Sequence, residues 1–496
     1  MNLRVPKPAS TALYGLSILI YFLRLSGGGI HTGFSHDDLM NMYRAWVEPL
    51  PRLVSDNLCF FLFPSSYRPF GGLFYHLFFN GFGFNPVPFR LLILLFLLAN
   101  IYLTYAFVRR LTASSEVAVI TALLHCYHVN FMPLYRNTGT CYDIFCFFFY
   151  LAAFLYYIRI RQQGRLLRPI EQLAFLGLLV CALNAKEIAV TLPVLIGVYE
   201  ALYYPPLAYR PRSLTSWVSW LYGNGRVMCW GILIDVAFLS GKVYGTNGIG
   251  RQGGYITAVS LHKYIHSLQH DLNEIFFTYG TSVFRDRNLA LLLLGALLVA
   301  WRSKSVSFRF SLLFWQIGVL PVAFIPSRGI YAVYIPLVGF AACAAIAWVK
   351  VRDLFSSRVC RMPPALAFLL LVFVMASFYH MKGADRLIGM DIQAAQISSV
   401  INGLRTTLPS ARKGARMLFL KDPFDNVPNA VWASYFITHL LYRDNTIELD
   451  HIALMPPYDY IFTVEQGRLV LVSPRNESSR RYSPDRRPET PGSQER

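Results

Sequence analysis

The chain has 496 residues, of which 55% are hydrophobic, 15% aromatic and only 15% charged, and its mean hydropathy is +0.40. Soluble domains carry about 25% charged residues, so this composition argues against a large soluble enzyme, and the 38 Phe and 30 Tyr argue against intrinsic disorder. The net charge of +19 fits either a nucleic-acid partner or basic flanks on membrane spans, and only its distribution along the chain can decide.

A transmembrane helix needs about 20 mostly apolar residues. Eleven apolar runs, several of them short, are predicted to span a membrane: Thr11–Gly29, Pro88–Phe107, Glu116–Met132, Cys141–Ile158, Glu171–Ala185, Ile188–Tyr204, Val227–Tyr244, Asn288–Trp301, Phe308–Ile325, Ile330–Val349 and Pro363–His380. A further apolar segment, Phe70–Phe84, is interrupted by glycines and is predicted to form a re-entrant or interfacial helix, with a true span as the lesser alternative. The expected fold is an all-α polytopic membrane protein.

The basic residues predict the orientation. Most arginines and lysines of the short connections lie in alternate ones, from Arg4 and Lys7 at the start to Arg358 and Arg361 after the tenth run. The positive-inside rule then places the N-terminus in the cytoplasm, and an odd number of spans places the C-terminal region on the outer side. The net charge therefore needs no nucleic-acid partner, and we expect none.

The chain is expected to divide into a transmembrane domain, residues 1–380, a small outer α/β domain, residues 381–473, and a disordered tail, residues 474–496. Residues 31–87 and 245–287 are the large outer loops of the first domain. In the second, Ala384–Leu408 and Asn429–Tyr442 are predicted helices. The predicted strands are Met417–Leu420, Ile447–Asp450, Ile461–Val464 and Leu469–Val472, with a turn at Gln466-Gly467.

The strongest chemical signal is His36-Asp37-Asp38, just beyond the first apolar run. A carboxylate there could be a general base for a hydroxyl nucleophile, or the pair could bind a divalent cation, Mg²⁺ or Mn²⁺. Helix capping is an equal alternative, because Ser35-x-x-Asp38 is a capping-box pattern. Neighbouring helical residues also point about 100° apart, so both carboxylates cannot easily serve one atom.

Two basic positions on the outer side are candidates for holding a phosphate. Arg68 opens the Phe70–Phe84 segment, where its planar guanidinium could bind a phosphate or simply extend to the membrane interface. Arg328 lies at the outer mouth of the tenth run and is followed by Tyr331.

Further polar residues interrupt the apolar runs. His125 and His128 are spaced to share a helix face, and Arg136 and Asp143 follow them; such residues line a cavity or hydrogen-bond between helices. Lys186-Glu187 separates two apolar runs and marks a hairpin turn, either as a mutual ion pair or with Lys186 facing an anionic donor. All these candidates share one predicted side of the membrane, where phosphate-binding cations near a carboxylate base suit transfer from a lipid-phosphate donor to a hydroxyl.

The order of the motifs resembles the membrane region of the transmembrane and tetratricopeptide-repeat O-mannosyltransferases and of their bacterial relatives in the GT-C superfamily. The resemblance covers roughly residues 31–345 and departs from the family pattern at Asn130 and before Asp143, where an arginine is missing. The motifs that carry it are His36-Asp37-Asp38, Tyr67-Arg68-Pro69, Asn85-Pro86, His125-x-x-His128-Val129, Ala185-Lys186-Glu187 with Thr191-Leu192-Pro193, and Arg328-Gly329-Ile330-Tyr331 with Pro336.

The resemblance implies an inverting glycosyltransferase that uses a polyprenyl- or dolichyl-phosphate sugar, with mannose as the candidate sugar, and a protein, lipid or glycan hydroxyl as acceptor. Asp37 or Asp38 would be the base, and Arg68, Lys186 and Arg328 would bind the donor phosphate. His36, His125, His128, Arg136, Asp143, Glu187 and Tyr331 would support the cavity. We expect a bacterial inner membrane with the site facing the periplasm, or alternatively the endoplasmic reticulum. The rival hypotheses are a flippase of lipid-linked sugars and a non-catalytic membrane subunit.

Overall fold

The computed structural model describes residues 8–59, 68–126, 128–204, 214–244, 257–278, 281, 283–303, 305–358, 364–425, 432–451, 457–465 and 468–472. The chain divides into two compact units, Met1–Ala394 and Ala395–Arg496. Tyr67, the glycine-rich stretch from Gly245 to Gly254, the predicted turn at Gln466-Gly467 and the predicted tail lie outside the described residues.

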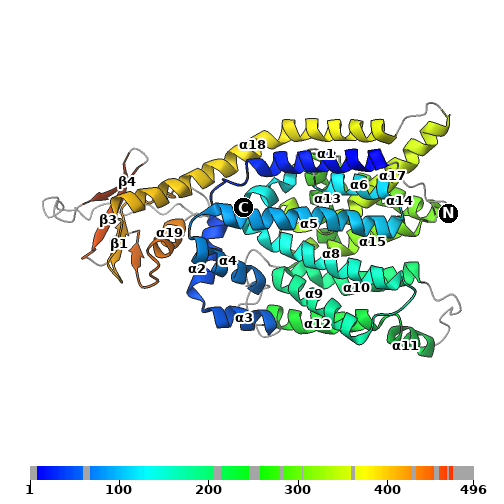
Figure 1. The fold of residues 1–496 in the computed structure, drawn as a ribbon, viewed down its shortest axis with the longest axis horizontal. Coiled ribbons are helices and arrows are strands. Elements are labelled where there is room, and N and C mark those ends of the chain that lie inside the picture. Colours follow the sequence, from blue (N-terminus) through cyan, green and yellow to red (C-terminus); the bar gives the residue numbers. More distant parts are fainter. Residues whose placement is uncertain are drawn as a thin grey trace. The chain divides into compact units, whose positions relative to one another are not determined.

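The first unit is helical throughout its described part (Figure 1). Its first half contains α1 (Pro8–Gly27), α2 (His36–Val47), α3 (Leu50–Leu58), α4 (Pro69–Phe82), α5 (Pro86–Thr112), α6 (Ser115–Cys126), η1 (Val129–Phe131), α7 (Met132–Arg136), η2 (Thr138–Thr140), α8 (Cys141–Arg161), α9 (Pro169–Ala185), η3 (Glu187–Thr191) and α10 (Leu192–Tyr203). Its second half contains α11 (Leu214–Tyr222), α12 (Arg226–Tyr244), α13 (Leu261–Phe276), α14 (Asp286–Ser303), α15 (Val306–Gly318), α16 (Leu320–Ala323), η6 (Ile330–Val333), α17 (Leu337–Arg358) and most of α18 (Pro364–Thr407).

Among the described residues, three segments are long and apolar enough to cross a membrane: Pro86–Thr112, Thr138–Arg161 and Val306–Ala323. Tyr14–Gly27, Ser115–Cys126 and Pro169–Ala185 are shorter apolar helices. The mostly helical fold is therefore confirmed, whereas the number of eleven spans stays a prediction.

Helix α8 is central to the bundle because it packs against both α5 and α9 (Figure 1). Aromatic rings fill its contacts: Phe154 lies 5.2 Å from Phe107 of α5 and 5.8 Å from Phe310 of α15, measured between ring centroids. On the other side of α15, Gly339 of α17 lies against the α15 backbone, where a Cβ would collide with atoms of Ser311 and Trp315. A small residue there lets two apolar helices approach closely, as in other helix pairs within membranes.

Two predicted boundaries were wrong. The predicted tenth run begins at Ile330, but residues 330–333 form the short η6 and the long helix α17 begins only at Leu337, after Pro336. The runs Pro363–His380 and Ala384–Leu408 were predicted as separate helices, but α18 continues through both. Gly383 is the only helix-weakening residue between them, and one glycine costs about 1 kcal/mol, which does not end a long helix.

The second unit contains a four-stranded sheet in the order β2-β1-β3-β4. Strands β1 (Arg416–Phe419), β2 (Glu448–Asp450) and β3 (Tyr460–Glu465) are parallel, and β4 (Arg468–Val472) runs antiparallel to β3. Met417 of β1 is in register with Leu449 and Tyr460 on either side. Helix α19 (Ala433–Tyr442) connects β1 to β2. The predicted small C-terminal sheet is confirmed, with strand ends shifted by at most one residue.

Candidate functional site

Five charged side chains meet where several helices of the first unit begin or end. Arg68 precedes α4, Asp143 lies in the first turn of α8, Lys186 and Glu187 join α9 to η3, and Lys242 lies in the last turn of α12. Each is therefore placed by a helix end and not by a helix middle. We call these five residues the cation cluster, because it contains three cations and two carboxylates.

The contacts of the cation cluster differ from a simple pairing of neighbours. Arg68 donates from Nε and Nη2 to Oε2 of Glu187, at 3.1 and 3.0 Å. Lys242 Nζ lies 3.8 Å from the other carboxylate oxygen, Oε1, of Glu187. Lys186 Nζ contacts Asp143 Oδ1. A mutual ion pair between Lys186 and Glu187 was one of the two alternatives open from the sequence. The structure instead gives each of them a partner on another helix.

Burial strengthens the electrostatic interactions among these charged side chains. The Arg68 and Glu187 side chains are 18% exposed and the Lys242 side chain only 1%. Burial by itself raises the pKa of Glu187, but the nearby charges of Arg68 and Lys242 outweigh it and lower the pKa to about 2. Glu187 is thus ionised at neutral pH, and the cation cluster keeps an excess of one positive charge.

Two tyrosines lie against the cations. The Arg68 guanidinium carbon is 5.3 Å from the ring centroid of Tyr142, and Lys186 Nζ is 5.7 Å from that of Tyr331. Both distances are in the range of cation–π attraction. Tyr331 lies in η6, three residues after the half-buried Arg328, so the structure brings the Arg328 segment to the same end of the bundle.

The structure separates the two adjacent aspartates. Asp38 is buried and forms the capping box of α2: its Oδ2 accepts from Ser35 N at 2.8 Å, and its amide donates to Ser35 Oγ. Its Oδ1 accepts from the Tyr75 hydroxyl at 2.7 Å. Burial raises the pKa of Asp38, although Arg90 and these hydrogen bonds act against the rise. Asp37 is exposed, so the capping hypothesis holds for Asp38 and leaves Asp37 accessible.

Asp37 lies on the face of α2 that leads to the cation cluster. Asn41 follows one helical turn later and donates from Nδ2 to the Asp37 carbonyl at 2.8 Å. The Asn41 side-chain oxygen accepts from the Tyr142 hydroxyl at 2.9 Å, and the Arg68 guanidinium lies over the Tyr142 ring. A Cβ on Gly139, in the turn before α8, would lie 3.3 Å from the Asp37 Cβ. One continuous set of contacts thus links the backbone of Asp37 to Arg68 of the cation cluster.

Two predicted cavity residues are used in packing. His125 donates from Nε2 to the Tyr334 carbonyl at 2.7 Å, and its ring stacks against the rings of both Tyr334 and Phe147. His128 donates from Nε2 to the Ile275 carbonyl at 2.8 Å. The prediction that the two histidines share a helix face was wrong, because α6 ends at Cys126 and His128 lies beyond it.

Arg136 and His36 also lie outside the cation cluster. The Arg136 guanidinium, at the end of α7, donates from Nη1 to both carboxylate oxygens of Asp391 in α18, at 3.0 and 3.1 Å. His36 is the first residue of α2 and is half-buried; burial lowers its pKa, and Asp37 partly offsets this. Arg136 is thus committed to an ion pair away from the predicted phosphate-binding residues.

A shared divalent-cation site at Asp37 and Asp38 does not fit the geometry. Both oxygens of Asp38 accept hydrogen bonds inside the fold, whereas Asp37 is exposed. In the described part of the chain, no group of three or more His, Cys, Asp or Glu side chains is arranged to hold a metal ion.

Sequence reasoning missed Lys242, Tyr142 and Asn41. Lys242 could have been found as an isolated cation near the end of an apolar run, which is costly unless it has a partner. Tyr142 and Asn41 carry no such signal, because a tyrosine at the start of an apolar helix and an asparagine on an amphipathic helix are both common.

Similarity to known proteins is found among solved structures. No family model and no curated protein matches the chain. Among solved structures, the chain is similar to the oligosaccharyltransferase of Archaeoglobus fulgidus in its apo form, with 12% sequence identity and a TM-score of 0.48. The alignment covers 90% of this chain, which spans 65% of the length of that enzyme.

Proposed function

We propose that the chain is an integral-membrane glycosyltransferase of the GT-C type, which transfers a sugar from a polyprenyl-phosphate donor to a hydroxyl acceptor with inversion. The observation that carries the proposal is the cation cluster: three cations and two carboxylates, partly shielded from water, at one end of an apolar helical bundle and linked to an exposed aspartate. The bundle would hold the lipid tail, and the cation cluster the phosphate.

Arg68, Lys186 and Lys242 bind the donor phosphate in this proposal, and Arg328 adds a further cation from the segment before η6. A sugar–phosphate diester carries one negative charge, which equals the excess charge of the cation cluster. When the sugar leaves, the phosphate gains a second negative charge. Preorganised cations in a site with little water stabilise that growing charge more than they stabilise the ground state, which is how they accelerate the reaction.

Asp37 is the general base. Its carboxylate accepts the proton of the acceptor hydroxyl while the hydroxyl oxygen forms a bond to the anomeric carbon and the bond from that carbon to the phosphate oxygen breaks. Attack from the face opposite the phosphate inverts the anomeric centre. Asp38 is a positioning residue that holds the first turn of α2 through Ser35.

The test compares Asp37→Asn with Glu48→Gln, a control at the other end of α2. Asp37→Asn should leave folding intact and lower transfer by at least about 100-fold, the usual contribution of a general base. Glu48→Gln should transfer like the parent. Normal transfer by Asp37→Asn would show that the base has been assigned wrongly. We further propose that the protein lies in a bacterial inner membrane with this site facing the periplasm.

A further inference from the structure

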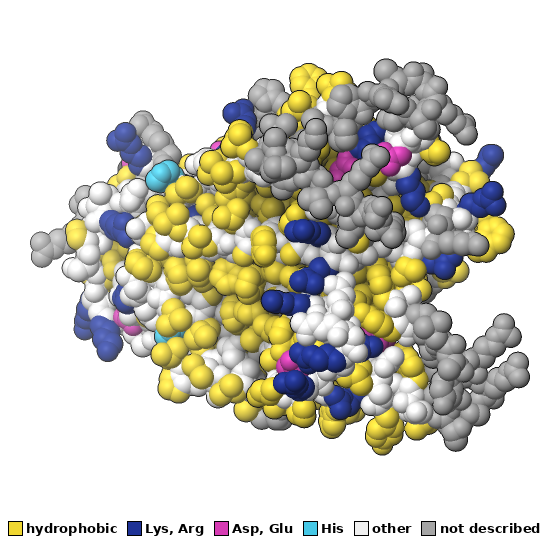
Figure 2. Space-filling model, turned by 45° about the vertical axis from the view of Figure 1, so that its right-hand side comes forward, with side chains coloured by type: hydrophobic (Ala, Val, Ile, Leu, Met, Phe, Trp, Pro, Cys, Tyr) yellow, Lys and Arg dark blue, Asp and Glu magenta, His cyan; other side chains and the backbone are white. Residues whose placement is uncertain are grey.

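A second concentration of arginines lies at the opposite end of α8 from the cation cluster. Asp143 is in the first turn of α8 and Arg161 is its last residue, so the two lie about 27 Å apart along the helix, close to the thickness of a bilayer core. Figure 2 shows Lys and Arg side chains gathered beside a broad hydrophobic surface. We call the end of the bundle at Arg161 the arginine end.

Six helix termini meet at the arginine end and are tied together there. Arg110 and Gln162 exchange hydrogen bonds between the ends of α5 and α8, at 2.8 and 3.0 Å. The Leu111 carbonyl of α5 accepts from Tyr203 of α10 and from Ser307 of α15. The remaining two termini belong to α9 and α12. These hydrogen bonds therefore hold the backbone positions from which the exposed side chains of the arginine end extend.

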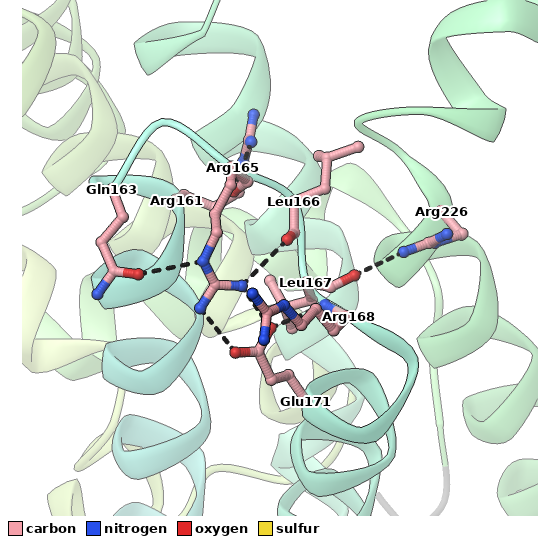
Figure 3. Close-up of polar contacts among 8 residues, drawn as sticks. All are labelled: Arg161, Gln163, Arg165, Leu166, Leu167, Arg168, Glu171 and Arg226. Carbon is pink, nitrogen blue, oxygen red and sulfur yellow. Dashed lines mark hydrogen bonds and ion pairs between the residues drawn. The ribbon is translucent and has the colours of Figure 1, made fainter.

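The loop between α8 and α9 is held by hydrogen bonds and ion pairs of three arginines (Figure 3). Arg165 donates to both oxygens of Glu171 at 2.6 and 2.7 Å, and Arg161 donates to the Arg165 carbonyl at 3.0 Å. Arg161 also donates to both oxygens of the buried Glu200. Arg226, at the start of α12, donates to the Leu167 carbonyl at 2.7 Å. Both carboxylates, Glu171 and Glu200, are therefore already paired with arginines of this loop.

Four other arginines on the same surface have no such partner. Arg109, Arg110, Arg159 and Arg168 are exposed, and none forms an ion pair with a carboxylate in the described part of the chain. Exposed apolar side chains of the same helices lie beside them; Ile170 is 71% exposed. A set of exposed guanidinium groups next to an apolar surface is complementary to a molecule with an anionic head and an apolar tail.

We propose that Arg109, Arg110, Arg159 and Arg168 form a binding surface for the headgroup of an anionic glycerophospholipid, whose acyl chains lie along α9. Each guanidinium can donate two hydrogen bonds to a phosphate. The inference does not depend on the proposed glycosyl transfer, which takes place at the other end of α8.

The test uses the purified full chain in detergent micelles and counts bound lipids by native mass spectrometry during titration with phosphatidylglycerol or phosphatidylcholine. Binding of phosphatidylglycerol should be at least about tenfold tighter, because each arginine near an anionic headgroup contributes roughly fivefold. The variant R109Q/R110Q/R159Q/R168Q should lose that preference. The pair variant R159Q/R168Q, which leaves the Arg110–Gln162 bonds intact, should lose part of it.

The matched control is R405Q/R412Q/K413Q/R468Q, which removes the same charge from exposed positions of the second unit. It should bind phosphatidylglycerol like the parent. Equal binding of the two lipids by the parent would overturn the proposal. So would an unchanged preference in the quadruple arginine variant, or an equal loss in the control, which would show that net charge alone is responsible.

Discussion

Replacement of Glu187 by Gln tests the electrostatics of the cation cluster. The change removes the carboxylate that lies between Arg68 and Lys242 and leaves the ammonium of Lys242, which is 1% exposed, without its counter-charge. The pKa of Glu187 is lowered from 4.5 to about 2, so its ionisation stabilises the fold by about 3 kcal/mol at neutral pH, at 1.36 kcal/mol per pKa unit. Loss of one partner from a buried pair costs a similar amount.

The sign of the pH dependence follows from the lowered pKa. A carboxyl group that is more acidic in the folded state stabilises the fold above its unfolded pKa, and the contribution is lost as the pH falls through the folded value. For Glu187, the contribution is complete above about pH 5, and about 2 of the 3 kcal/mol are lost by pH 3. The stability difference between the parent and Glu187→Gln should shrink by that amount.

The assay is denaturant unfolding in mixed micelles at several pH values, with Glu48→Gln as the control. The side chain of Glu48 is 34% exposed in an i,i+4 pair with Arg52, so its removal should change the free energy of unfolding by less than about 1 kcal/mol. The reasoning is refuted if Glu187→Gln is as stable as the parent at pH 7, or if its deficit is the same at pH 3.

Two further predictions concern packing and titration elsewhere. Gly339→Ala should destabilise the fold by about 1–3 kcal/mol, because the added Cβ meets the α15 backbone. Gly177→Ala lies in open space on α9 and should be neutral or stabilising by up to about 1 kcal/mol. Thermal unfolding measures both variants, and equal behaviour of the two would show that the packing assignment is wrong. In the second unit, His451 Nδ1 lies 3.1 Å from Asp422 Oδ2, and this carboxylate raises the pKa of His451. Asp422→Asn should return that pKa toward 6.5 in an NMR titration, and the stabilisation by the pair should be present below pH 6.5 and fade as the pH rises; an unmoved pKa would contradict the pairing.

Much of the fold follows from sequence periodicity. Long apolar runs became helices and the short apolar segments of the second unit became strands, because segments of about 4–8 residues are typical of strands and longer ones of helices. Helix ends were predicted less well, both beside Pro336 and where neither glycine nor proline is present. Helix α6 ends at Cys126 with neither residue beside it, and His128 was placed on that helix in error.

Four of the five residues of the cation cluster stand out in the sequence, but their pairing does not. Arg68, Asp143, Lys186 and Glu187 each stand out as charges that interrupt apolar sequence. Which cation meets which carboxylate depends on how α4, α8 and α9 pack, and no local pattern encodes it. The choice between Asp37 and Asp38 likewise depends on burial: the capping box could be read from the sequence, but the hydrogen bond from Tyr75 that completes it could not.

The most direct test of the account is donor turnover. The purified chain would be incubated with a panel of polyprenyl-phosphate sugars and a hydroxyl acceptor, and release of polyprenyl phosphate would be measured for the parent, Asp37→Asn and Lys242→Met. The account predicts that the parent consumes one donor of the panel, that Asp37→Asn releases none, and that Lys242→Met needs more donor for half-maximal turnover. Equal turnover by the parent and Asp37→Asn, or no turnover of any donor by a folded parent, would contradict it.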